Sequence, residues 1–423
     1  MPQYLYPGVY VEEAPPSARP ISGVGTSTAG FIGVVMSDVQ MPLKPGKKED
    51  DVDGYFTVAK LETDTQSSKV QLITSWEQFK NTFGDFQLNK GVEFDPDGKL
   101  VMENGKLKLT ERADDTNYNA YRRLQHSVYG FFNNGGTRCW VIRVAAATNL
   151  TGLTVELGKL EPIDEVAIVV VPGATAKAQQ DAIIEHCEKM EDRVAILDGN
   201  QATNFTKEEI KGNTKDSKYA ALYFPWIKVF DPVIKEDISQ PPSGHLAGIY
   251  ARVDAERGVY KAPANEVIRG ATDLDHKLSP NDQKGLNPDG INVIRAFDGN
   301  FNIWGARTLG GDGNGEFKYI STRRYFNFLC KSIDQGTQFV VFEPNSPALW
   351  KRITRSVSDF LLRQWREGAL FGDTPNQAFF VRCDKDTNTS DVIDAGQVVT
   401  EIGVAIVKPA EFVIFRIQQI TGQ

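Results

Sequence analysis

The sequence predicts a multidomain protein that combines α/β and α+β folds and carries an extended β-prone arm at each end. Its 423 residues are enough for two or three domains. Hydrophobic residues make up 41% of the chain and charged residues 24%, a balance that can fill packed cores. In the middle of the chain, short apolar runs alternate with helical patterns, as they do where helices cover a parallel sheet. We expect an N-terminal arm at 1–20, an α+β region at 21–150, an α/β domain at 151–305, a mixed α+β C-terminal domain at 306–407 and a C-terminal β-arm at 408–423.

The N-terminal arm is predicted from proline spacing. The first 20 residues contain five prolines around a β-prone stretch at residues 4–11. Pro7 interrupts this stretch and Pro15 and Pro16 bound it, so it cannot close a hairpin on itself. We therefore expect an extended segment that pairs with another subunit. Its predicted contact residues are Tyr4, Tyr6, Val9, Tyr10 and Val11.

The region 21–150 has clear local signals. A buried strand is expected at residues 31–36, where every residue is apolar or glycine. Ser75 has the character of a helix N-cap, and Gly84 that of a helix stop. A further helix at 122–132 and a strand at 139–144 follow.

Two polar stretches, at 37–69 and 87–119, are predicted to be insertions. The second contains an Asn104-Gly105 turn signal with alternating apolar residues on either side, which is typical of a solvated β-hairpin. We expect both stretches to lie on the outside of the protein.

The α/β domain is predicted from alternating runs. Continuous apolar runs at 166–171, 194–197 and 220–224 are typical of strands buried on both faces, and residues 176–190 have helical spacing. This order predicts a parallel sheet with covering helices.

The C-terminal domain is predicted to contain a strand at 339–342, a long helix at 346–370 and another strand at 379–382. One stripe of the helix is apolar. Arginines recur at helical spacing on another stripe. A solvated face is the simpler interpretation, but in an acidic protein this local basic stripe could also dock an acidic partner surface. The arginines are Arg352, Arg355, Arg363 and Arg366.

The last 16 residues predict a strand with apolar side chains on both faces. A chain end rarely carries such a strand unless it adds to a sheet of its own or of a neighbour. The predicted contact residues of this C-terminal arm are Phe412, Val413, Ile414, Phe415 and Ile417.

Composition argues against several classes of function. Lys and Arg total 47 against 55 Asp and Glu, a net charge of −8, so no global positive field would attract nucleic acid. No apolar run reaches 18 residues, and we expect no direct membrane insertion. The four cysteines and four histidines lie far apart, without the spacing of a metal site. We expect no metal and no cofactor.

The candidate catalytic motifs lack residues that their chemistry requires. Residues 25–30 have the glycine spacing of half a phosphate loop, but Phe31 and Ile32 stand where a lysine and a hydroxyl residue are needed. Ser243 and His245 lie in a Pro-Pro loop without the Gly-x-Ser-x-Gly motif of a nucleophile elbow. We expect no catalytic residue.

Ordered motifs along nearly the whole chain resemble those of contractile tail sheath proteins of bacteriophages and of phage-tail-like injection machines. Each motif is weak alone, but the ordered set is specific. The motifs include PGVYVEE at 7–13, TSTAGFIG at 26–33, FFNNGG at 131–136, YFPW at 223–226, PPSGH at 241–245, ARVD at 251–254, KAPAN at 261–265, WGART at 304–308, FEPN at 342–345 and KPAEF at 408–412.

The resemblance implies a sheath subunit. It implies stacked six-membered rings of this chain in a helical sheath around an inner tube protein, whose contraction drives the tube through a target cell envelope. It also implies a subtilisin-like middle domain without protease function, arms that add strands to neighbours, and a tube-facing C-terminal domain. On that basis we expect the four arginines to contact the tube.

The resemblance further implies baseplate and terminator or cap proteins as partners. It also implies assembly in the bacterial cytoplasm as part of a phage tail, virion or released extracellular particle. Two alternatives stay open: a degenerate subtilisin-like hydrolase, and a static baseplate or capsid component.

Overall fold

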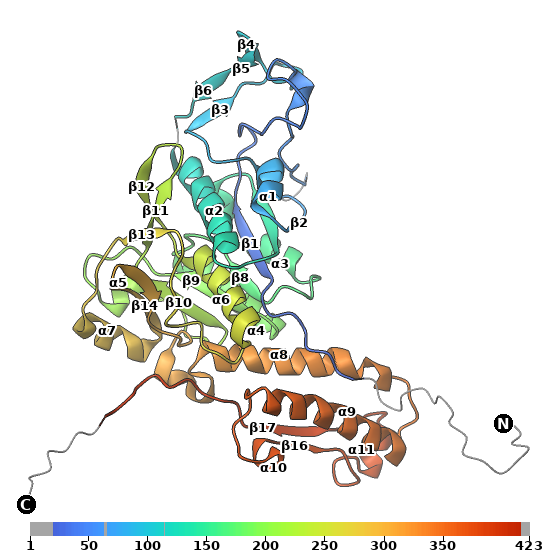
Figure 1. Cartoon of the computed structure of the whole chain (residues 1–423). Helices are drawn as coiled ribbons and strands as arrows, with labels where there is room; N and C mark the ends of the chain where they lie inside the picture. Colours follow the sequence, from blue (N-terminus) through green and yellow to red (C-terminus); the bar gives the residue numbers. More distant parts are fainter. Residues whose placement is uncertain (1–19, 63–65, 114, 416–423) are drawn as a thin grey trace, which may run out of the picture. The chain divides into compact units, whose positions relative to one another are not determined.

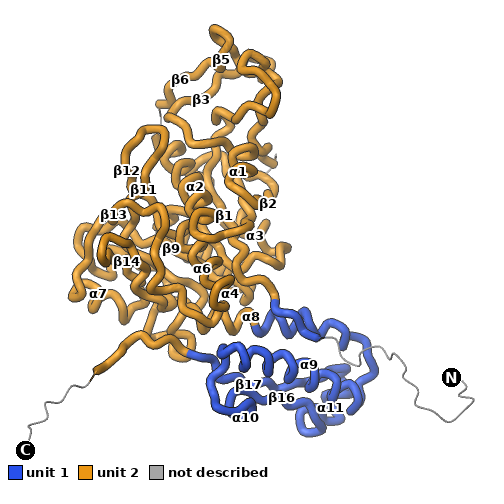
Figure 2. The backbone as a smooth tube through the Cα atoms, in the orientation of Figure 1, with its two compact units in different colours: residues 1–23, 329–407 blue, residues 24–328, 408–423 orange. Residues whose placement is uncertain are grey.

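The computed structural model describes residues 20–62, 66–113 and 115–415. The chain forms two compact units (Figure 2). Among the described residues, unit 1 comprises 20–23 and 329–407, and unit 2 comprises those within 24–328 together with 408–415. Along these residues the chain passes from unit 1 into unit 2, back into unit 1 and again into unit 2.

An eight-stranded sheet forms the centre of unit 2, with strand order β15-β14-β10-β9-β8-β1-β7-β2 (Figure 1). The inner pairs are parallel, and only the edge strands β2 and β15 are antiparallel to their neighbours. The strands are β1 (Ala29–Val34), β2 (Gln71–Ile73), β7 (Cys139–Val144), β8 (Ile168–Val170), β9 (Val194–Asp198), β10 (Ala220–Phe224), β14 (Ile291–Phe297) and β15 (Asn300–Ile303).

Strands β1, β8, β9 and β10 are buried at every residue, which explains their continuous apolar sequences. The helices of unit 2 cover the sheet. In Figure 1, α2 and α6 run side by side, and both pack against sheet strands. The helices are α1 (Trp76–Phe83), α2 (Asp115–Asn133), α3 (Thr154–Leu160), α4 (Lys177–Met190), α5 (Lys207–Ile210), α6 (Ser243–Arg257) and α7 (Pro280–Leu286).

Local signals located several elements correctly. Ser75 accepts a hydrogen bond from the backbone N–H of Gln78 and begins α1, and Gly84 ends that helix with φ 93°. The hairpin predicted in the second polar stretch is β4 (Met102–Glu103) with β5 (Lys106–Leu107). The remaining small sheets of unit 2 are β3 (Lys90–Val92) with β6 (Leu109–Glu111), and β11 (Ile227–Asp231) with β12 (Glu236–Gln240) and β13 (Ala271–Leu274).

The compact units divide the chain differently from the predicted domains. Strand β1 lies between β7 and β8, so Ala29 is aligned with Cys139 on one side and with Ile168 on the other. The predicted boundary at residue 150 therefore falls within one sheet. Residues 306–328 belong to unit 2 because the backbone of this stretch bonds back to it, for example from Leu309 N–H to Ala220 carbonyl.

The polar stretches also carry structural contacts. Within 37–69, Val39 and Met41 are buried in the core of unit 2, and the hydroxyl of Ser68 accepts a hydrogen bond from the backbone N–H of Arg143. Helix α2 begins inside the second stretch, at Asp115. Part of each stretch therefore contributes to the core or to a helix of unit 2.

Unit 1 is built around α9 (Pro347–Arg366), which begins after the N-cap Ser346, close to the predicted start, and ends four residues before the predicted end at 370. Its apolar stripe is buried, including Leu349, Ile353, Val357, Phe360 and Leu361. Helix α8 (Ile320–Thr337) runs across the boundary between the units at residues 328 and 329. The other elements are α10 (Pro375–Ala378), α11 (Ser390–Asp394) and the antiparallel pair β16 (Phe379–Arg382) and β17 (Glu401–Val404).

The strand predicted at 339–342 is wrong. Gln338–Val340 form a short 3-10 helix, and Phe342 has a left-handed backbone with φ 65° and a fully exposed side chain. A run of four apolar residues carries no periodicity that distinguishes a strand from a turn, and Pro344 follows too closely for a strand to extend.

Candidate assembly site

The structure places the four predicted arginines on α9 but gives them different surroundings. A guanidinium nitrogen of Arg352 lies 3.4 Å from a carboxylate oxygen of Glu343, and the guanidinium carbon lies 5.3 Å from the ring centre of Phe339. Arg363 donates a hydrogen bond to the backbone carbonyl of Ile21 at 2.6 Å. These two arginines therefore also hold parts of unit 1 together.

The other two arginines are more available to a partner. Arg355 is exposed, and its nearest ion-pair partner, Asp359, lies 4.0 Å away on the same helix, which gives little stabilisation. Its side chain lines an open hollow of about 400 Å³ that Lys351 and Arg382 also line. Arg366 is exposed in the last turn of α9.

The β16–β17 pair has two open edges, because no other strand of the described residues pairs with either one. Ala405 donates its backbone N–H to the carbonyl of Ala378 at 2.8 Å, in register with the pairing of the two strands. Hydrogen-bonded and non-hydrogen-bonded positions alternate along an antiparallel pair. The backbone groups of Phe379 and Val381 therefore point away from β17, and those of every second β17 residue from Ile402 point away from β16.

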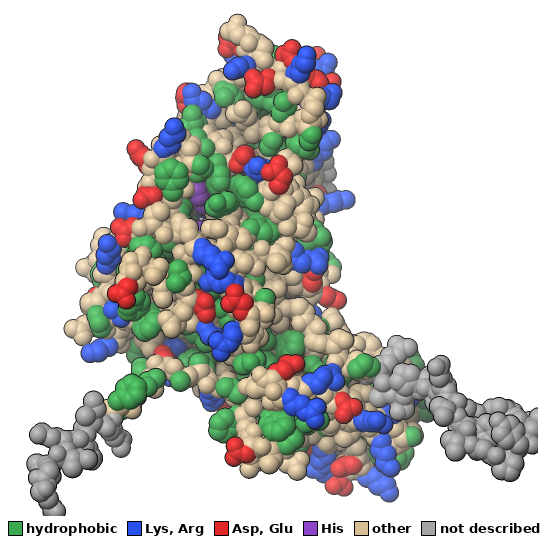
Figure 3. Space-filling model, in the orientation of Figure 1, with side chains coloured by type: hydrophobic (Ala, Val, Ile, Leu, Met, Phe, Trp, Pro, Cys, Tyr) green, Lys and Arg blue, Asp and Glu red, His purple; other side chains and the backbone are tan. Residues whose placement is uncertain are grey.

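The described end of the chain is an exposed apolar segment. Phe412, Val413, Ile414 and Phe415 are 70%, 69%, 80% and 84% exposed, and the structure assigns them no strand. Figure 3 shows the apolar side chains along this segment. The other predicted arm residues, Ile417 and residues 4–11, lie outside the described residues.

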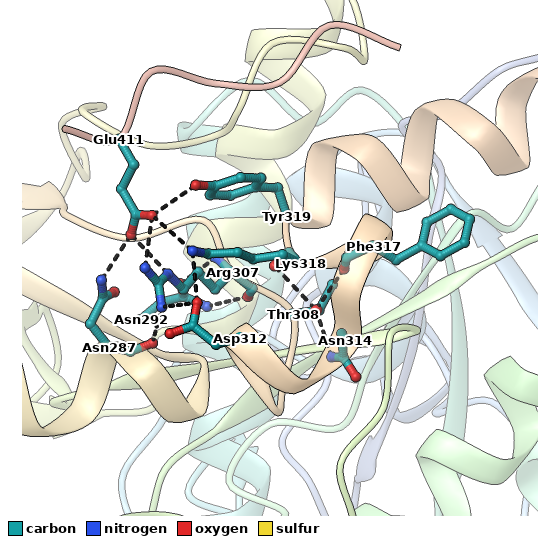
Figure 4. A network of polar contacts seen from close by, with 10 residues as sticks. All are labelled: Asn287, Asn292, Arg307, Thr308, Asp312, Asn314, Phe317, Lys318, Tyr319 and Glu411. Atoms are coloured by element: carbon teal, nitrogen blue, oxygen red, sulfur yellow. Dashed lines mark hydrogen bonds and ion pairs between the residues drawn. The ribbon is translucent and has the colours of Figure 1, made fainter. Parts of the chain in front are cut away.

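Glu411 lies directly before this apolar segment, within a polar network (Figure 4). Its carboxylate accepts two hydrogen bonds from Arg307, both at 2.8 Å, in a bidentate arrangement. Asn287 and Tyr319 each donate a further hydrogen bond at 2.8 Å. Both carboxylate oxygens therefore have two donors.

The electrostatics of this network favour the ionised carboxylate. Burial alone would raise the pKa of Glu411, but the hydrogen bonds from Arg307, Asn287 and Tyr319 outweigh burial and hold that pKa below its usual value. Burial and the hydrogen bond to Glu411 raise the pKa of Tyr319 to about 12. At neutral pH the network therefore holds a charged acceptor and a neutral phenol.

Ser243 does not form a pair with His245 in this structure. The Ser243 hydroxyl donates to the carboxylate of Asp198 at 2.7 Å, and the Ser243 N–H donates to the other carboxylate oxygen at 2.9 Å. Burial raises the pKa of Asp198 to about 6 against the hydrogen bonds from Gly173 and Ser243. The ring of His245 packs against Gly130, where a Cβ would lie 2.4 Å from the imidazole. This arrangement joins β9 to the start of α6.

The described residues contain no group of His, Cys, Asp or Glu that could hold a metal ion. Among the helices that the structure describes, none has both the length and the apolar character needed to cross a membrane.

Sequence reasoning missed the Glu411 network. Arg307 and Glu411 belong to two of the motifs noted above, but 104 positions separate them, and no local pattern pairs them. The one available signal was a lone acidic residue at the start of an apolar arm.

Comparisons with known proteins bear on this arrangement. Residues 153–309 match the model of the phage tail sheath protein central domain, and residues 312–420 match that of the phage tail sheath C-terminal domain. A prophage major tail sheath protein of Pseudomonas aeruginosa (strain UCBPP-PA14) is 27% identical over 284 residues, which cover 65% of this chain and 70% of that protein. The tail sheath protein of Escherichia phage P2 is 22% identical over 323 residues, covering 75% and 76%.

Solved structures agree over almost the full length. The sheath complex of the extracellular contractile injection system PVC, in its contracted state, is 28% identical with a TM-score of 0.71, covering 99% of each chain. The contracted helical sheath of the anti-feeding prophage AFP is also 28% identical, with a TM-score of 0.70 and coverage of 98% and 99%. This chain belongs to the contractile tail sheath family and is a structural subunit of a contractile sheath.

Proposed function

We propose that copies of this chain form stacked six-membered rings in a helical sheath around an inner tube, and that the terminal arms join each copy to its neighbours by strand addition. The observation that carries this proposal is that unit 1 has an antiparallel strand pair, β16–β17, with two open edges, while the described end of the chain is apolar, exposed and without a strand partner.

Each subunit has as many open strand edges in its β16–β17 pair as it has arms. Each β16–β17 pair can accept one strand on each side, and each chain supplies two β-prone arms. Open edges present rows of unpaired N–H and C=O groups that an incoming strand satisfies, while pockets for alternate side chains give specificity. A strand from each of two neighbours would turn this strand pair into a four-stranded sheet.

Strand addition also suits contraction. Main-chain hydrogen bonds between an arm and the β16–β17 pair can persist while the compact units rotate, because extended linkers absorb the changes in backbone dihedral angles. The sheath would then contract without dissociating into subunits. Its extended form would be a kinetically trapped state that releases free energy on contraction.

Two truncations test the arms. We expect deletion of residues 1–18, or of residues 412–423, to leave a folded, soluble monomer that no longer forms tubes; the second deletion retains Glu411. The measurement is negative-stain microscopy, in which the full chain should form striated hollow cylinders. Cylinders formed by either truncated chain would contradict the role of that arm, and rings without cylinders from the full chain would favour a static baseplate component.

We further propose that the arginine face of α9 contacts the inner tube in the extended sheath. Arg355 and Arg366 are its most available members, since Arg352 and Arg363 also bind Glu343 and Ile21. Contacts between exposed charges weaken with salt, so they can break as the sheath widens.

Charge reversal tests this contact. Arg355→Glu with Arg366→Glu should reduce tube-templated assembly and its dependence on salt, because the stripe would then repel an acidic tube surface. Lys99→Glu with Lys385→Glu is the control with the same change in charge, at two exposed residues outside α9. Unchanged assembly of the double variant on the tube would contradict the contact.

In this proposal the middle of unit 2 has a subtilisin-like fold without protease function. The helix-covered sheet with parallel inner strands supports the fold. The lost protease function is supported by the Ser243 hydroxyl, which donates to a buried aspartate, and by the ring of His245, which packs against Gly130. Labelling of Ser243 by a serine-reactive probe would instead favour a degenerate hydrolase.

A helical polymer built from head-to-tail contacts has two unlike ends, so it needs a different partner at each. We therefore propose baseplate proteins at one end and terminator or cap proteins at the other. The particle would assemble in the bacterial cytoplasm and act as a phage tail or a released injection particle.

A further inference from the structure

We infer that Glu411 is the anchor of the C-terminal arm: by binding Arg307 it fixes the start of the arm to unit 2, so that tension on the arm reaches the central sheet of that unit. This inference rests on the proposed role of the arm in joining subunits, and it adds the residue that positions the arm.

The attachment runs through one side chain. Residues 408–415 are the described part of the arm and its approach. All the hydrogen bonds that this segment makes are accepted by the carboxylate of Glu411, and its backbone groups make no hydrogen bond. Loss of the Glu411 contacts would therefore leave the described segment without a hydrogen bond. A strand paired at several positions would not depend on one residue in this way.

Arg307 is itself held in place through both its guanidinium group and its backbone. It is 3% exposed, and its Nη1 donates to the backbone carbonyl of Asn287 at 2.9 Å. Its backbone N–H donates to the side-chain oxygen of Asn292 at 2.7 Å, and its carbonyl accepts from the Asn292 amide at 2.8 Å. Asn292 is fully buried in β14. The contacts thus form a continuous path from Glu411 to the eight-stranded sheet (Figure 4).

The position of Glu411 in the chain gives the anchor its effect. Val407 donates to the carbonyl of Ala369 within unit 1, and four residues later Glu411 binds within unit 2. The exposed apolar run begins at the next residue, Phe412. Tension on that run is therefore transmitted through Glu411 to Arg307 of unit 2 before it reaches the strands of unit 1.

The main test is Glu411→Gln in the full-length chain. The amide keeps the shape of the carboxylate but places an N–H group among donors and loses the charged bidentate pair. Glu256→Gln is the matched control, because Glu256 is exposed on α6 of unit 2, away from both the β16–β17 pair and the arms in the sequence. We expect Glu411→Gln to raise the critical concentration for sheath assembly at least tenfold and Glu256→Gln to change it less than twofold.

A second measurement separates anchoring from folding. A nitroxide at Phe412→Cys, in a background where the exposed Cys330 is replaced by Ser, reports arm mobility in the monomer. The anchored arm should give a broadened spectrum, and Glu411→Gln should sharpen it while circular dichroism stays unchanged. If Glu411→Gln fails to fold, Tyr319→Phe removes one of the four hydrogen bonds and should raise the critical concentration a few-fold.

The outcomes distinguish the two proposals. If deletion of residues 412–423 leaves assembly intact, the arm does not join subunits, and the proposed function fails. If that deletion abolishes assembly but Glu411→Gln assembles and keeps a broad spectrum like the wild type, the anchor is overturned while the arm keeps its role.

Discussion

A proline at position 381 should block one open edge of the β16–β17 pair without breaking the pair itself. The alternation set by the Ala405–Ala378 hydrogen bond directs the N–H of Val381 away from β17. Proline lacks that N–H and is tolerated at strand edges. The change therefore acts on the group that an incoming arm would use.

The size of the effect follows from the geometry of β16. Along Phe379–Arg382, the outward backbone groups belong to Phe379 and Val381, so an added strand gains up to about four main-chain hydrogen bonds of about 0.5–1.5 kcal/mol each. Val381→Pro removes one donor, leaves the carbonyl of the incoming strand unpaired and places a ring in its path. A loss of about 1.5–3 kcal/mol per contact corresponds to roughly a 10- to 100-fold higher critical concentration.

The assay is assembly of purified full-length chain at increasing concentration, followed by light scattering and negative-stain microscopy. Val381→Ala is the control, because it removes most of the side chain but keeps the N–H. Val381→Pro should leave the circular dichroism of the monomer unchanged and raise the critical concentration, while Val381→Ala should change it about threefold or less. If both variants assemble alike, this edge does not accept an arm.

Three further changes test the interior of unit 2. Arg324 contacts Asp254 at 2.6 Å in a buried ion pair, so Arg324→Met should lower the free energy of unfolding in urea by about 3–5 kcal/mol; an unchanged midpoint would contradict this. A Cβ at Gly248 would lie 2.3 Å from a backbone oxygen of α2, so Gly248→Ala should lower thermal stability by about 1–3 kcal/mol, unlike Gly313→Ala, where the space is open. Burial lowers the pKa of His245 to about 3 from 6.5, so below pH 6.5 the unfolded chain binds a proton that the folded chain does not, and the free energy of unfolding falls. His245→Gln should reduce this fall between pH 7 and 5 by about 2 kcal/mol. Parallel curves of unfolding free energy against pH for the variant and the wild type would contradict this.

The elements that could be predicted from the sequence are those with a local cause. Ser75 and Ser346 each supply the oxygen that caps the helix after it, and Gly84 supplies the conformation that ends one. The buried strands β8, β9 and β10 need only a continuous apolar run between turns. The apolar stripe of α9 follows from helical spacing alone.

The missed features have long-range causes. Strand β1 pairs with β7 and β8, more than 100 residues later, so nothing near residue 150 shows that the sheet continues. Arg307 is held by Asn292 on one side and by Glu411 on the other, and Glu411 lies 104 positions away in the sequence. The role of the arms is harder still to predict from one sequence, because no local pattern in a chain identifies the neighbouring subunit whose strand completes its sheet.

The two kinds of proposed contact should respond to salt in opposite ways. Arm contacts combine main-chain hydrogen bonds with burial of Phe412, Val413, Ile414 and Phe415, each worth about 1–3 kcal/mol when fully covered, and kosmotropic salts strengthen such burial. Contacts of Arg355 with an acidic tube are screened, since the Debye length falls from about 10 Å at 0.1 M to about 3 Å at 1 M. Rising sulfate concentration should therefore release sheath from tube while the sheath stays polymeric. Release of free subunits before the tube separates would show that charge, and not the arms, holds the sheath together.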